Sequence, residues 1–130
     1  MKFLDFELSK KFEELGFKKR AYGFYTTTGT FSFAYSNFRG VCVVDCTCNY
    51  NSFPEDVIGH EFVDAPTIEQ ALNWMLETKS IHINAVAESP DTWYAEIHFL
   101  KDGKTITLLE IVESRDDAYI SAFKKLSEIL

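Results

Sequence analysis

Two histidines and a glutamate in the C-terminal half have types and spacings that could support metal or acid–base chemistry. His82 lies in a segment of alternating polarity at 81–87, and Glu96 and His98 lie in a second such segment at 92–101. If these segments pair as antiparallel strands, His82 and His98 become cross-strand neighbours with Cβ atoms about 5 Å apart. Two imidazoles and a carboxylate are the ligands of an open zinc site, and they could equally form an acid–base pair.

The rest of the same surface is polar as well. A third strand at 104–112 would place Thr107 opposite His98, and Asn84 would face Glu96 one pair further along. Alternation alone puts such residues on the solvent side of a half-exposed sheet. Two interpretations of these residues therefore remain: they form the site of a metal-binding protein or small hydrolase, or they are an ordinary solvated surface.

Other catalytic motifs are missing from the sequence. The 6 glycines are not clustered into a phosphate-binding loop, and no serine has a recognisable histidine and aspartate pattern. Cys42, Cys46 and Cys48 alternate along one predicted strand, which places Cys42 about 13 Å from Cys46, too far for a disulfide or one zinc ion. Buried, reduced thiols in a reducing compartment fit this spacing better. The sequence predicts no cofactor.

A long segment at 49–65 interrupts the alternating pattern and combines aromatic with acidic residues. Loops of this length are uncommon in compact domains and are often functional. We expect the segment either to contact a protein partner or to be an ordinary connection, with a short strand near 60–63. Its candidate protein-binding residues are Tyr50, Phe53, Glu55, Asp56, His60, Glu61 and Phe62.

Three helices are predicted from capping residues and apolar spacing. The first follows Asp5 as N-cap and ends before Gly16, whose left-handed conformation would let Phe17 fold back onto the helix. The second begins with a capping box at Thr67, and Ser114 caps the third. The apolar stripes are Ile68, Ala71, Leu72, Met75 and Leu76 in the second helix, and Tyr119, Ala122, Phe123, Leu126 and Leu130 in the third.

Strands are predicted in two groups of three, one group after each of the first two helices. In the first group, a two-residue turn at 28–29 would pair Phe24 with Phe33 and gather the aromatic side chains on one core face. In the second group, Asp102 and Gly103 are typical of a two-residue type I′ turn. The second group would pair Ile81 with Phe99, Ile83 with Ile97, Ile97 with Leu108, Phe99 with Ile106 and Trp93 with Val112.

The predicted order is α-βββ-α-βββ-α, an α+β fold with antiparallel sheet and helices on one face. The 130 residues suit one domain, with a weak internal repeat at about 1–64 and 65–130. A net charge of −7 disfavours nucleic acid, and no apolar run reaches the roughly 20 residues that span a bilayer. We therefore expect a cytoplasmic protein that binds neither nucleic acid nor membrane.

Five segments with predicted caps, turns or apolar stripes resemble parts of known proteins: 7–17, 65–74, 81–83, 93–94 and 114–130. In these segments the chain resembles small uncharacterised proteins encoded by phages and integrated mobile elements of gut bacteria. The resemblance implies a mobile-element accessory gene product. Because those proteins have no established activity, it assigns no functional residue. The chain departs from them in the cysteine strand and in the long loop.

Together these patterns favour a non-enzymatic interaction module that binds another protein, of accessory, inhibitor or immunity type. A metal-binding protein or small hydrolase using His82, His98 and Glu96 is one alternative. A small-ligand binder that uses Trp74, Trp93, Tyr94 or the outer sheet face is another. Unpaired edge strands would also favour a homodimer.

Overall fold

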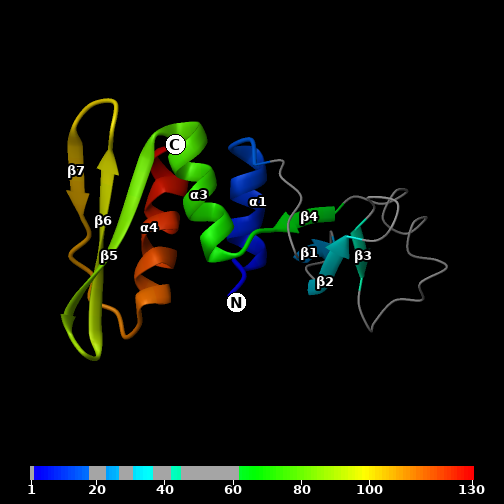
Figure 1. Ribbon diagram of the computed structural model, residues 1–130, viewed down its shortest axis with the longest axis horizontal. Helices are drawn as coiled ribbons and strands as arrows, with labels where there is room; N and C mark the ends of the chain where they lie inside the picture. Colours follow the sequence, from blue (N-terminus) through cyan, green and yellow to red (C-terminus); the bar gives the residue numbers. More distant parts are fainter. Residues whose placement is uncertain (1, 18–22, 27–30, 37–41, 45–61) are drawn as a thin grey trace. The chain divides into compact units, whose positions relative to one another are not determined.

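The computed structural model describes residues 2–17, 23–26, 31–36, 42–44 and 62–130. In chain order they form α1 (Phe6–Glu14), β1 (Gly23–Thr26), β2 (Phe31–Ser36), β3 (Cys42–Val44), β4 (Phe62–Ala65), α3 (Ile68–Lys79), β5 (Ile81–Ser89), β6 (Thr92–Phe99), β7 (Lys104–Thr107) and α4 (Arg115–Ile129) (Figure 1). Helices and two antiparallel sheets in this part of the chain confirm the α+β class.

These elements group into two compact units. One unit, Phe3–Thr67, contains α1 and a four-stranded sheet of order β3-β2-β1-β4. The other, Met1–Lys2 with Ile68–Leu130, contains α3, α4 and a three-stranded sheet of order β5-β6-β7. The internal repeat at about 1–64 and 65–130 stays a prediction. The first group has a fourth strand, β4, near the short strand expected in the long loop, and it pairs with β1.

The helix α1 has the ends that the sequence predicts. The carboxylate of Asp5, its N-cap, accepts the backbone N–H of Leu8 at 2.8 Å. Gly16 has a φ of +106°, and the N–H of Phe17 donates to the carbonyl of Phe12 at 2.9 Å, which completes a Schellman ending. The two phenylalanine rings meet edge to face with centroids 6.2 Å apart, and both are buried.

Tyr25 on β1 connects the first sheet to the N-terminal segment. Its hydroxyl donates to the carbonyl of Leu4 at 2.8 Å, and its ring lies 5.5 Å from that of Phe6. Leu4 is fully buried and donates its own N–H to the carbonyl of Pro66 at 2.9 Å. Burial, followed by the negative charge of Asp5, raises the pKa of Tyr25 above its usual value of 10.0.

The register of the first hairpin differs from the predicted one by a single residue. Tyr25 lies opposite Phe31, and Phe24 lies opposite Ser32 instead of Phe33. An odd number of residues separates Tyr25 from Phe31, which a two-residue turn cannot produce. Because a one-residue shift exchanges the faces of the two strands relative to each other, the prediction that Phe24 and Phe33 share one aromatic face is wrong. Phe24 is nevertheless buried.

The strands β5 and β6 pair in the predicted register. Their pairs include Ile81 with Phe99, His82 with His98, Ile83 with Ile97, Asn84 with Glu96 and Ala85 with Ala95. One face of this ladder is buried, and α3 and α4 pack on it (Figure 1). The alternating pattern therefore identified both the register and the covered face, because each strand has one apolar side.

The β6–β7 hairpin differs from the prediction by two residues. The strand β7 starts opposite Phe99, so a four-residue connection at 100–103 replaces the predicted two-residue turn. Gly103, with a φ of +73°, donates its N–H to the carbonyl of Phe99 at 2.8 Å. Ile97 consequently lies opposite Ile106 and not opposite Leu108. A shift by two residues keeps every side chain on its predicted face.

The apolar stripes of the last two helices are partly as predicted. In α3 the indole of Trp74 is buried while Leu76 is exposed, because the covered face follows 68, 71, 74 and 75 around the helix. In α4, Ala118 is buried, whereas Leu130 is exposed because it follows the last helical residue. None of the helices in the described ranges is long and apolar enough to cross a bilayer.

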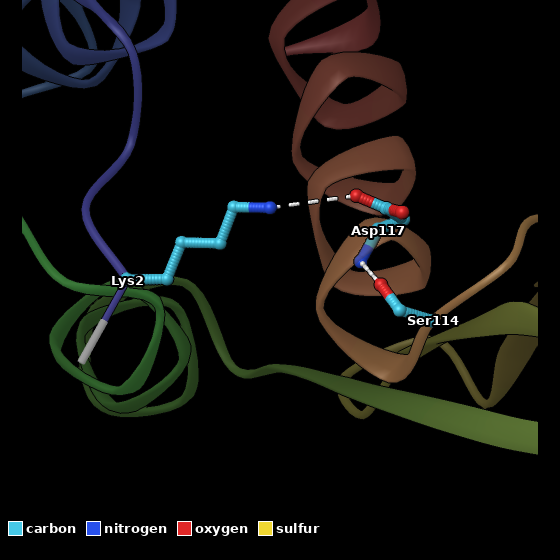
Figure 2. A network of polar contacts seen from close by, with 3 residues as sticks. All are labelled: Lys2, Ser114 and Asp117. Atoms are coloured by element: carbon cyan, nitrogen blue, oxygen red, sulfur yellow. Dashed lines mark hydrogen bonds and ion pairs between the residues drawn. The ribbon is translucent and has the colours of Figure 1, made fainter.

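The start of α4 is capped as predicted. The hydroxyl of Ser114 accepts the N–H of Asp117 at 3.0 Å (Figure 2). The ammonium of Lys2 lies 3.5 Å from the carboxylate of Asp117 and forms an ion pair with it (Figure 2). Both side chains of this ion pair are about half exposed, so it contributes less than about 1 kcal/mol.

We expect the Gly16→Ala substitution to destabilise the protein by about 1 kcal/mol, because a side chain disfavours the left-handed conformation. A Cβ atom at Gly16 would meet nothing within 4 Å, so the cost is conformational and not steric. Unfolding in urea measures it. Gly16→Asn is the matched control and should cost less, since asparagine tolerates positive φ. Equal stability of the alanine variant and wild type would contradict the Schellman ending.

We expect Tyr25→Phe to lower stability by about 1 kcal/mol near neutral pH, because the hydrogen bond to Leu4 is lost. The raised pKa of Tyr25 adds a pH dependence. The contribution of its neutral form is fully present below the usual tyrosine pKa of 10.0 and is lost as pH rises through the raised value. The difference in unfolding free energy between wild type and variant should therefore shrink at alkaline pH. A difference that stays constant with pH would show that the pKa of Tyr25 is the same in the folded and the unfolded protein.

Candidate functional site

The face of the C-terminal sheet opposite α3 and α4 carries a row of polar side chains. Its members are His82 and Asn84 on β5, Tyr94, Glu96 and His98 on β6, and Thr105 and Thr107 on β7. The residues from β5 and β7 are exposed, and those from β6 are half-buried because neighbours flank the central strand on both sides. We call these seven residues the polar face.

The two histidines of the polar face stack on each other. The ring centroids of His82 and His98 are 5.9 Å apart, with an angle of 28° between the ring planes. On its other side, His98 places Nδ1 3.0 Å from the hydroxyl of Thr105. The sequence predicted Thr107 at this place, and the two-residue shift of β7 substitutes Thr105 for it. The central imidazole is therefore held between a second ring and a hydroxyl.

The carboxylate predicted to join these histidines does not complete a three-ligand centre. Glu96 lies opposite Asn84, one pair along the ladder from the two rings. Within the described residues, no group of three or more histidine, cysteine, aspartate or glutamate side chains could hold a metal ion. The arrangement leaves a pair of imidazoles as the chemically distinctive feature of the polar face.

The strand predicted at 104–112 is interrupted. The observed β7 is shorter, and beyond it the chain meets β6 again at two points. The N–H of Leu108 donates to the carbonyl of Ala95 at 2.9 Å, and Val112 and Trp93 exchange two backbone hydrogen bonds of 2.8 Å. The predicted pair of Trp93 with Val112 is thereby confirmed.

Between these two points the facing segments differ in length. The strand β6 contributes Tyr94 alone, whereas the other segment contributes Leu109, Glu110 and Ile111. The two additional residues form a bulge, which we call the 109–111 bulge. The side chain of Leu109 is 90% exposed and that of Ile111 is 47% exposed. The bulge was not predicted, although the two adjacent leucines at 108 and 109 break the alternation of polarity along the strand.

The predicted protein-binding loop is not part of the described structure. Outside the described residues lie Tyr50, Phe53, Glu55, Asp56, His60 and Glu61, together with Cys46 and Cys48. Phe62 begins β4, where it lies opposite Thr26, and Cys42 begins β3, opposite Ser36. The interpretation of 49–65 as a recognition loop stays a prediction. Of the residues predicted to line a small-ligand site, Trp74 is buried, with the Lys79 ammonium 5.6 Å from its ring centre.

The chain matches no protein-family model, no curated protein and no solved structure. The mobile-element origin implied by the resemblance stays a prediction. The polar face and the 109–111 bulge are therefore the features from which a function can be inferred.

We expect Thr105→Val to change the tautomer of His98, because it removes the hydroxyl 3.0 Å from Nδ1. NMR of the imidazole nitrogens reports which nitrogen carries the proton. Thr105→Ser, which keeps a hydroxyl, is the matched control, and His82 should be much less affected than His98. Unchanged His98 signals in the valine variant would show that the hydroxyl does not orient the ring.

Proposed function

We propose that this protein binds another protein and that the 109–111 bulge is its principal contact. One observation carries the proposal: Leu109 is 90% exposed, yet the backbone on both sides of it is attached to β6 by hydrogen bonds of 2.8–2.9 Å. Burying such a side chain in a partner would contribute about 1.5–3 kcal/mol. Because the backbone on both sides of the bulge is already hydrogen-bonded to β6, less backbone entropy is lost on binding than for a free loop.

The charges around the bulge define the partner further. Glu110 lies within it and Glu113 follows shortly after, and both are exposed. The whole chain carries a net charge of −7. Complementary charge on two surfaces accelerates their association and disfavours wrong partners. The partner supported by these features has an apolar pocket for Leu109 bordered by lysine or arginine side chains.

At the β7 edge of the C-terminal sheet, the structure favours a partner that binds projecting side chains over one that adds a strand to the sheet. The strand β7 spans only Lys104–Thr107, and the 109–111 bulge interrupts the edge directly after it. Short edge strands and bulges are devices by which proteins prevent another strand from pairing with a sheet. A partner that meets this edge would therefore contact the projecting side chains rather than extend the ladder.

We expect Leu109→Ser to weaken partner binding by at least about tenfold, because the apolar contribution of the leucine is lost. The partner is first captured from a lysate of the cells that express the protein, then produced in pure form and titrated by calorimetry. Leu100→Ser is the matched control, since Leu100 is 56% exposed in the β6–β7 connection and should leave affinity unchanged. High salt should slow association of the wild-type protein.

Two results would overturn the proposal. Equal affinity of wild type and Leu109→Ser, or equal weakening by Leu100→Ser, would show that the bulge is not the contact. If no captured protein depends on Leu109, the assignment of protein binding through this bulge fails. Thermal unfolding of both variants checks that each remains folded.

A further inference from the structure

We propose that His82 and His98 form a second site, separate from the 109–111 bulge, that chelates one transition-metal dication of the Zn²⁺, Ni²⁺ or Cu²⁺ class. Imidazole nitrogen suits these ions, whereas Mg²⁺ and Ca²⁺ prefer oxygen ligands. The inference stands on the stacked rings and not on the protein-binding proposal. Water molecules would fill the coordination positions that the two imidazoles leave open.

The backbone places the two histidines directly opposite each other on neighbouring strands. His82 and His98 are directly opposite in a ladder whose neighbouring pairs, Ile81–Phe99 and Ile83–Ile97, are also formed. Cα atoms of such pairs are about 4.5–5.5 Å apart. Two nitrogens that each lie about 2.0–2.1 Å from one tetrahedral zinc ion are about 3.3 Å from each other. The ring centroids are 5.9 Å apart, so chelation requires the rings to rotate toward each other, and His82 is exposed on the open side of the sheet.

The hydroxyl of Thr105 prepares His98 for this role. When Nδ1 of His98 carries the proton, it donates to Thr105 Oγ1, 3.0 Å away, and the lone pair remains on Nε2. Metal-binding histidines commonly use their second nitrogen in this way, which fixes both tautomer and ring orientation. The threonine would thus be a positioning residue for the ligand nitrogen of His98.

The surrounding charge favours a cation. Glu96 lies on the same face one pair along, beside Asn84, and the chain carries seven net negative charges at neutral pH. A dication placed between the imidazoles would therefore meet attraction from its nearest charged neighbour on this face. With two protein ligands and no third in the described residues, we expect moderate and reversible affinity.

The test is calorimetric titration of the full chain with ZnCl₂, in a non-coordinating buffer above the usual histidine pKa of about 6.5. The double variant His82→Ala/His98→Ala is the reference for zinc bound elsewhere, including at the cysteines. Wild type should show one site that the double variant lacks. Each single variant should lose at least about tenfold in affinity for that site, since a chelate needs both rings.

Variants at two other positions test whether this pair of histidines, oriented by Thr105, is what holds the ion. His60→Ala removes the remaining histidine of the chain and should leave the affinity unchanged, whereas Thr105→Val should weaken it and Thr105→Ser should not. NMR should show that the Nε2 signals of His82 and His98 shift together on zinc addition. Equal zinc binding by wild type and the double variant overturns the proposal, as does an equal loss in His60→Ala. His82→Gln and His98→Gln replace the alanine variants if either fails to fold.

Discussion

The pairing of β5 with β6 is the constraint on which the C-terminal unit depends. Ile83 and Ile97 face α3 and α4, while His82 and His98 face away from them. A slip of one residue would bury two imidazoles and expose two isoleucines, at a cost of several kcal/mol in apolar burial alone. The same register therefore builds the core and presents the histidines on the polar face.

The 109–111 bulge follows from the geometry of the turn before it. The four-residue connection closed by Gly103 displaces β7 by two residues from the register of a two-residue turn. Val112 and Trp93 nevertheless meet in the register that the shorter turn would give. Two additional residues must consequently be accommodated between β7 and this bridge. The exposure of Leu109 is the structural result, and it places an apolar side chain at a sheet edge that is otherwise protected from strand pairing.

The two hairpins show that a register shift by an odd number of residues has a different consequence from a shift by an even number. In the second hairpin the turn is two residues longer than predicted, so Ile97 and Ile106 remain on the buried side. In the first hairpin the error is one residue, so Phe24 lies opposite Ser32 and does not share a face with Phe33 as predicted. The interactions of Tyr25 with Leu4 and Phe6 could not have been inferred from either register, because they join residues about twenty positions apart.

The sequence by itself determined the features whose partners are close in the chain or repeat along it. The caps at Asp5, Gly16 and Ser114 involve backbone groups within five residues, and the β5–β6 register follows from alternation on both strands. Only the tertiary structure decided the turn lengths, the 109–111 bulge and the burial of Trp74 in place of Leu76. These depend on how distant elements share a core and how two strands close together, and no local preference contains that information.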